Sequence, residues 1–90
     1  MEVKDMVFLL EKTIEELKME DNWHAEELEK RMRDFCDRIG TKTKILFMLL
    51  RIAETGSKVS PPLFDTFEII GKDSTIRRLT NCKKYLEAIE

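Results

Sequence analysis

The chain has 90 residues, of which 42% are hydrophobic and 38% are charged, and its formal net charge is −2. This length suits one modest domain, and the composition is that of a folded globular chain, not of a disordered or fibrous one. The longest apolar run, residues 45–50, is too short to span a bilayer, and early acidic residues argue against a signal peptide. We therefore expect one domain over residues 1–90 in the cytoplasm, without membrane contact.

The first half of the chain predicts two helices. Apolar residues at helical spacing predict the first over residues 3–19. The second is expected to begin at His24 as N-cap, with the Glu27 carboxylate reaching back to it and Trp23 packing on the first turn. Histidine is a poor cap, so a start at Asn22 is the alternative.

The third predicted helix covers residues 43–55 and is apolar on almost every side. A helix of this kind is expected at the centre, surrounded by the others. Arg51 is its only basic residue past the first turn, so we expect it at a surface rim or in an ion pair. Gly40 and Gly56 are expected to end the second and third helices.

Two more helices are predicted in the last third of the chain. Ser60 is a good N-cap, and Pro61 suits the first helical position. This helix is expected to stop at Gly71, and Asp73 or Ser74 to cap the fifth. No segment alternates as a strand would, so the predicted fold is all-α, a compact bundle of about five helices. The side chains of the fifth helix expected to point inward are Ile76, Leu79, Leu86 and Ile89.

The sequence offers no set of residues suited to catalysis or to metal binding. His24 is the only histidine, and it lies among glutamates at a helix start, where we expect a surface residue. Cys36 and Cys82 form no C-x-x-C pair, so two free, buried or half-buried thiols are expected. The glycines stand alone and form no phosphate-binding loop. We therefore expect a binding protein, without catalytic residues, cofactor or metal.

Charge is divided unevenly along the chain. Residues 1–40 carry a net charge of −5, and residues 41–90 carry +3. A polyanion would be attracted by the second half and repelled by the first. Lys72, Arg77 and Arg78 gather near one helix start, where they form either a solvated face or a set of phosphate contacts.

Four stretches in order resemble motifs near the C-terminus of bacterial-type glutamyl-tRNA synthetases. They are W-H-A-E-E-L at 23–28, L-F-M-L-L-R-I-A-E-T-G at 46–56, V-S-P-P-L-F-D at 59–65 and I-I-G-K-D at 69–73, the last followed by Arg78-Leu79. The resemblance covers about residues 6–88. It implies the helical subdomain that reads the anticodon of glutamate tRNA. The ATP-holding H-I-G-H and K-M-S-K-S type signatures of that family are absent, so the resemblance implies binding without aminoacylation.

The resemblance also implies roles for single residues. Arg51 matches the arginine that contacts anticodon bases, whereas Ser60, Pro61 and Leu63 match positions that line the base pocket, with Phe64 beside them. Unpaired bases are read on their edges by a guanidinium fork and packed on their faces by apolar side chains. Helix capping and core packing are the alternative explanation for Pro61 and Leu63. The three basic residues at 72, 77 and 78 would then contact the RNA backbone.

Some positions depart from the family. His24 stands in place of Thr or Asn, Leu49 in place of Pro, and Glu54 in place of Leu. An acid three residues from Arg51 would pair with it or weaken a contact to RNA. The alternative function is therefore a helical protein–protein interaction domain that keeps the scaffold without the RNA site, with the catalytic part of a synthetase as one partner. The class I lysyl-tRNA synthetases are a second, more distant resemblance.

Overall fold

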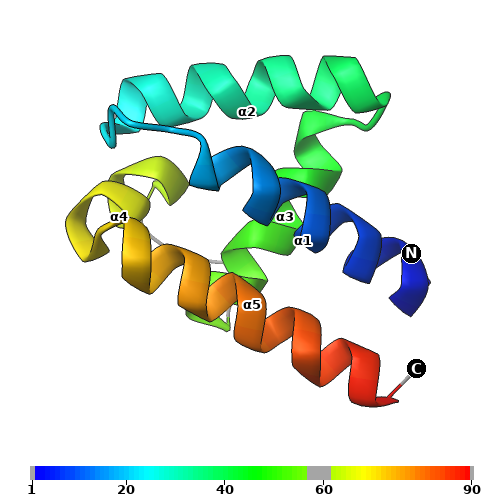
Figure 1. Ribbon diagram of the computed structural model, residues 1–90. Coiled ribbons are helices and arrows are strands. Elements are labelled where there is room, and N and C mark those ends of the chain that lie inside the picture. The colour runs from blue at the N-terminus through cyan, green and yellow to red at the C-terminus, as the bar shows by residue number, and fades with distance from the viewer. Residues whose placement is uncertain (1, 57–61, 90) are drawn as a thin grey trace.

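The structure is a computed structural model that describes residues 2–56 and 62–89. These residues contain five helices and no strand (Figure 1). The prediction of an all-α bundle of about five helices is confirmed, and within the same residues no helix has the length and apolar character needed to cross a membrane. The helices are α1 (Val3–Lys18), α2 (Ala25–Ile39), α3 (Thr43–Thr55), α4 (Leu63–Ile70) and α5 (Lys72–Ile89).

The first and last helices form the most extensive packing pair. α1 and α5 run in opposite directions, so the start of α1 and the end of α5 lie at the same end of the molecule (Figure 1). α3 contacts all four other helices, and α2 and the short α4 pack against each other. α3 therefore connects the α1–α5 pair with the α2–α4 pair.

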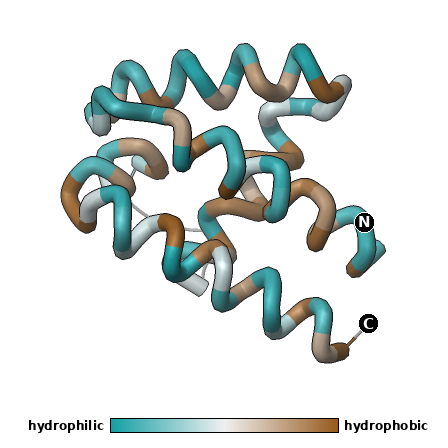
Figure 2. The backbone as a smooth tube through the Cα atoms, in the orientation of Figure 1, coloured by the Kyte–Doolittle hydropathy of each residue, from teal (hydrophilic) through white to brown (hydrophobic). Residues whose placement is uncertain are grey.

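The core is built from leucine, methionine and phenylalanine side chains that repeat every three or four residues along each helix. α2 is hydrophilic over most of its length, whereas α3 is mostly hydrophobic (Figure 2). Burial of each large apolar side chain contributes roughly 1.5–3 kcal/mol to folding. The core residues without solvent exposure include Leu10, Leu17, Leu28, Met32, Leu46, Leu50, Phe67 and Leu79.

The two cysteines contribute to the hydrophobic core. Cys36 is buried and Cys82 is half-buried, and both are free thiols. Both side chains pack in or against the hydrophobic core. The prediction of two buried or half-buried free thiols is confirmed.

α2 begins where the sequence indicated, but it is not capped as predicted. His24 is the N-cap residue, and its side chain makes no capping hydrogen bond. The backbone N–H of Ala25 instead donates to Oε1 of Glu68, 2.6 Å away on α4. Trp23 Nε1 donates to the carbonyl oxygen of Phe67 at 2.8 Å. The predicted capping box with Glu27 is wrong, because the N–H of His24, which Glu27 would accept in such a box, donates to the carbonyl oxygen of Asn22 at 2.9 Å.

α3 is central, yet the prediction that it is surrounded on all sides is wrong. Ile45, Met48 and Ile52 are 39%, 38% and 40% exposed. Together with Met6 and Leu49 they line an open apolar groove. The four neighbouring helices cover the rest of α3 and leave this strip uncovered.

The junction between α4 and α5 is shorter than predicted. α4 begins at Leu63, with Pro62 as its N-cap, and Ser60 and Pro61 lie outside the described residues. Gly71 alone separates the two helices, and its φ of +88° permits a sharp corner that other residues rarely adopt.

α5 therefore starts at Lys72, and Asp73 and Ser74 lie inside it instead of capping it. Of its predicted inward side chains, Leu79 is buried. Ile76 and Leu86 are partly buried and pack against the core. Ile89 is 56% exposed because it is the last helical residue, so its inward placement is wrong.

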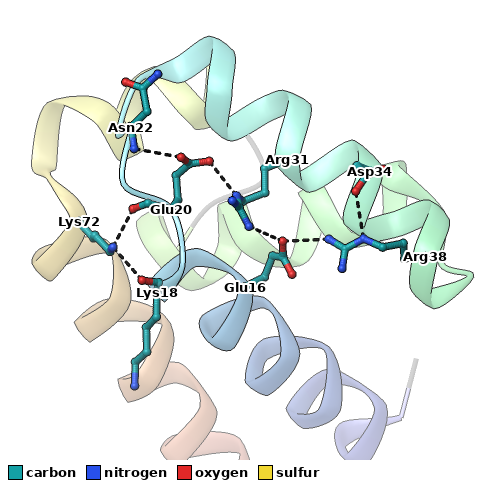
Figure 3. A network of polar contacts seen from close by, with 8 residues as sticks. All are labelled: Glu16, Lys18, Glu20, Asn22, Arg31, Asp34, Arg38 and Lys72. Atoms are coloured by element: carbon teal, nitrogen blue, oxygen red, sulfur yellow. Dashed lines mark hydrogen bonds and ion pairs between the residues drawn. The ribbon is translucent and has the colours of Figure 1, made fainter.

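A polar network joins α1, α2 and the loop between them (Figure 3). One Glu16 oxygen accepts hydrogen bonds from Arg31 at 2.6 Å and from Arg38 at 2.9 Å. Arg31 Nε also donates to Glu20 at 2.7 Å, and this bond lowers the pKa of the Glu20 carboxyl. The network holds α2 against α1 and the loop that joins them.

Candidate nucleic-acid interface

An open pocket of about 260 Å³ lies where α2, α3 and the start of α4 meet. The floor is apolar, since it includes buried side chains of α3 and α4, whereas charged side chains form much of the remaining lining. The pocket is lined by Ala25, Glu26, Glu29, Arg33, Phe47, Arg51, Pro62, Leu63, Phe64 and Asp65.

The aromatic rings of the floor hold one another in place. Phe47 and Phe64 meet edge to face, with their centroids 5.0 Å apart and their planes at 83°. Phe64 makes a second edge-to-face contact with Phe67, at 5.6 Å and 85°. Such pairs stabilise by about 0.5–1.5 kcal/mol beyond burial alone. The floor is therefore rigid and apolar, suited to the face of a flat ring.

The charged lining contains two guanidinium groups and three carboxylates. Arg33 and Arg51 come from α2 and α3, and the acids are Glu26, Glu29 and Asp65. The Arg33 guanidinium lies over the Phe47 ring, 5.4 Å from its centroid, and its Nε donates to Glu29 at 2.9 Å. A ligand here meets both hydrogen-bond donors and acceptors above an apolar surface.

The structure brings together three of the residues that the sequence singled out. Arg51, Leu63 and Phe64 line the same pocket, with Arg51 half-buried at its side. Leu63 and Phe64 are 3% and 6% exposed, so both are also core residues. The predicted roles of Ser60 and Pro61 fall on positions outside the described residues.

Sequence reasoning missed several further lining residues, among them Arg33 and Phe47. Phe47 precedes Arg51 by one helical turn, so the spacing of the two residues was a usable signal. Arg33 lies on the face of α2 opposite the predicted apolar stripe, where any charged residue is expected. Only the packing of α2 beside α3 reveals its place.

The three basic residues predicted to contact phosphates do not line the pocket. Lys72 Nζ donates to the carbonyl oxygens of Lys18 at 2.9 Å and Glu20 at 2.7 Å (Figure 3). Arg78 Nη1 donates to the carbonyl oxygen of Glu54 at 3.2 Å. Arg77 is exposed. Two of the three therefore already hold backbone carbonyl groups within the fold.

Glu54 does not interact with Arg51 in the way that their spacing suggested. Its side chain is 5% exposed, and neither carboxylate oxygen has a hydrogen-bond partner among the described residues. Burial raises the pKa of Glu54 to about 7, although the positive charge of Arg78 acts in the opposite direction. Among the described residues no ion pair joins Glu54 to Arg51, and Arg51 instead lines the pocket.

Residues 2–56 and 62–89 hold no group of three or more His, Cys, Asp or Glu side chains arranged to bind a metal ion. The polar groups at the pocket are thus two guanidinium forks and single carboxylates around an aromatic floor. This is the chemistry of recognising a planar, hydrogen-bonding group.

Comparison with known proteins defines the class to which this fold and pocket belong. Residues 2–83 match the family described as an anticodon binding domain, so the chain belongs to that family. It is similar to part of the glutamate–tRNA ligase of Cutibacterium acnes, with 45% identity over 67 residues, or 73% of this chain and 14% of that protein.

The glutamate–tRNA ligases of Roseiflexus castenholzii and Chloroflexus aurantiacus are also similar. The first is 38% identical over 88% of this chain and the second 36% identical over 90%, each match covering 16% of the relative. The chain therefore spans about one seventh of the length of the curated relatives that it matches. The resemblance to the C-terminal anticodon-binding domain of glutamyl-tRNA synthetases is confirmed at the level of the family.

Proposed function

We propose that this chain binds the anticodon loop of a glutamate-type tRNA and contributes recognition without catalysis, in the cytoplasm. The single observation that carries the proposal is the pocket that joins Arg51 to the Phe47–Phe64 floor. A guanidinium fork beside an apolar floor suits the edge and the face of an unpaired base. Membership of the anticodon binding domain family supports the same assignment.

The proposed protein partner is the catalytic part of a glutamate–tRNA ligase, whether joined to this chain or separate. The support is the similarity to about one seventh of those ligases. The chain alone is acidic overall, with a net charge of −2. We therefore expect weak binding by the isolated domain, near the non-specific range of about 10⁻⁴–10⁻⁶ M.

The test is a salt-dependent titration of the domain with a glutamate-type anticodon stem-loop and with a stem-loop of changed anticodon. Selective binding that weakens as salt rises is the expected result, because phosphate contacts release counterions and base contacts discriminate. Equal binding to both loops, or none at low salt, contradicts anticodon recognition by this domain.

Arg51→Ala provides the residue-level test of the same proposal. The variant should fold normally, because Arg51 is half-buried at the pocket and outside the core cluster. It should bind both stem-loops with nearly equal affinity, since the fork that reads the base is gone. Equal loss of binding to both loops would assign Arg51 a role in charge attraction only.

Two features motivate the alternative function, a helical protein–protein interaction domain: an acid beside Arg51 and the acidic first helices. Because Glu54 is buried and forms no ion pair with Arg51 among residues 2–56 and 62–89, that part of the motivation is lost, and we do not pursue this function as a second candidate.

A further inference from the structure

We infer that the last turn of α3 opens when Glu54 loses its proton, so that the contact between α3 and α5 responds to pH. The inference goes beyond the proposed function and does not depend on it, because it concerns the fold of the domain without RNA. It gives a role to a buried carboxyl group that does not line the pocket.

Glu54 lies at the end of α3, where this helix packs beside α5 (Figure 1). Its side chain is 5% exposed, and neither carboxylate oxygen has a hydrogen-bond partner among the described residues. A protonated carboxyl group tolerates such a place far better than a carboxylate does, because an isolated charge is costly to bury. Burial accordingly raises the pKa of Glu54 to about 7. The group therefore changes its charge near neutral pH.

The Arg78 guanidinium of α5 is the cation that acts on Glu54. Its positive charge lowers the pKa of Glu54, against the larger effect of burial. Its Nη1 donates to the backbone carbonyl oxygen of Glu54 at 3.2 Å, and the Glu54 side chain accepts no hydrogen bond within the described residues. Exposure to water is thus the change that stabilises the ionised side chain.

The charged groups of the other elements around α3 lie at the pocket or bind elsewhere. α1 meets α3 at the apolar groove. The remaining charged groups are Arg51 of α3 itself, Arg33 of α2, and Asp65 and Glu68 of α4.

The turn that carries Glu54 is held by hydrogen bonds at the very end of the helix. The last carbonyl groups of a helix lack partners within it, and Arg78 supplies one for the carbonyl oxygen of Glu54. The N–H of Gly56 donates to the carbonyl oxygen of Ile52 at 2.8 Å and closes the turn. Opening of one terminal turn costs less free energy than unfolding of the whole domain. Ionisation of Glu54 should therefore open this turn while the rest of the fold stays intact.

The size of the effect follows from the pKa of Glu54 in the two forms. Exposed, the carboxyl group has its ordinary pKa of 4.5, and in the closed turn the pKa is about 7. The closed turn therefore loses stability as pH rises from 4.5 to 7, since the open form gives up the proton first. Between pH 6 and pH 8 the ratio of open to closed turns should rise about 10-fold, with most of this rise below pH 7.

The test is amide hydrogen exchange of the 90-residue chain, measured by NMR at pH 6 and pH 8 and corrected for the intrinsic pH dependence of exchange. The Gly56 N–H reports on the end of α3. The Gly40 N–H is the matched control, because it ends α2 in the same left-handed conformation by donating to the Cys36 carbonyl oxygen. We expect opening at Gly56 to rise about 10-fold and opening at Gly40 to change less than about 2-fold. Low concentrations of urea should not alter the rise, since opening of one turn exposes little surface.

Variants assign the effect to Glu54. Glu54→Gln keeps the shape of the side chain and removes its charge, so the rise at Gly56 should vanish. Glu54→Leu is a second uncharged variant with the same expected result. Glu11→Gln, at an exposed position on α1, should keep the full rise. Arg78→Met removes the neighbouring positive charge, so the midpoint of the pH dependence should move to higher pH.

The inference is overturned if opening at Gly56 does not change between the two pH values, or if its rise persists in Glu54→Gln and Glu54→Leu. It is also overturned if Gly40 shows the same rise, or if exchange at Gly56 depends on urea as steeply as global unfolding does. Glu54 would then ionise only when the whole domain unfolds. Failure of stem-loop binding would contradict the proposed function and leave this inference standing, because none of these measurements uses RNA.

Discussion

At the scale of single residues, Glu54 links folding to pH. Its ordinary pKa is 4.5, and in the folded protein burial raises it to about 7. Below pH 4.5 the Glu54 carboxyl is protonated in both the folded and the unfolded protein, so its ionisation does not lower the free energy of unfolding. As pH rises from 4.5 to 7, the unfolded chain gives up this proton first, so stability falls. Above pH 7 the loss is complete and amounts to about 3 kcal/mol.

We therefore predict that Glu54→Leu raises the free energy of unfolding by about 2–3 kcal/mol at pH 8 and by much less at pH 5. The apolar side chain removes the cost of burying a carboxylate that has no hydrogen-bond partner within the described part of the chain. Urea unfolding at the two pH values measures the effect. Glu11→Leu, at an exposed position, is the control and should change stability by less than about 0.5 kcal/mol. A gain that is the same at both pH values would contradict the buried charge.

The sequence predicted part of the candidate site, and the missing part has a physical reason. Arg51, Leu63 and Phe64 were accessible because they belong to contiguous motifs. Arg33 was not, because an exposed arginine on a charged helix face has no distinctive spacing. The burial of Glu54 was also hidden, because residues three apart are neighbours on a helix and the sequence does not tell which of the two the packing will bury.

At the scale of elements, the start of α2 is held by α4 and not by its own sequence. Trp23→Phe keeps an aromatic ring but removes the hydrogen bond to the Phe67 carbonyl oxygen and part of the packing of the indole against the core. We predict a loss of about 1–3 kcal/mol in the free energy of unfolding. His24→Ala should cost less than about 0.5 kcal/mol, because the imidazole makes no capping bond. Urea titration checks both variants. A larger loss of stability in His24→Ala would contradict this prediction and favour the local capping by His24 that the sequence suggested.

The helices themselves were largely readable from the sequence. Hydrophobic spacing and isolated glycines placed α1, α2 and α3 almost to the residue. The one-residue corner at Gly71 was missed because Asp73 and Ser74 are good caps in isolation. The open strip on α3 was missed because an apolar helix surface does not reveal which of its sides the neighbouring helices will cover.

At the scale of the whole molecule, Lys72 ties the start of α5 to the end of α1. Lys72→Met keeps the aliphatic stem and removes two hydrogen bonds to backbone carbonyl groups. We predict a loss of about 1–3 kcal/mol in stability. Arg77→Met, at an exposed neighbouring position, should leave stability unchanged and reduce the slope of RNA binding against salt by about 1.

Thermal unfolding and stem-loop titration of these two variants distinguish the roles of the two cations. If Lys72→Met leaves stability unchanged and reduces the slope of RNA binding against salt, Lys72 contacts phosphate groups as the sequence suggested. If the Lys72→Met variant keeps both its stability and its salt slope, Lys72 neither stabilises the fold nor contacts phosphate groups.

The antiparallel pairing of α1 with α5 also has a consequence for synthesis of the chain. Within this chain α1 is made before α5, its main packing partner, and more than fifty residues separate the two helices. Until α5 emerges, α1 can pack only against α2 and α3 and lacks its most extensive contacts, and contacts between distant segments form slowly. The domain can therefore complete its core only after translation has passed its final helix, and a nascent chain stalled before α5 would present Leu10 and Leu17 to chaperones.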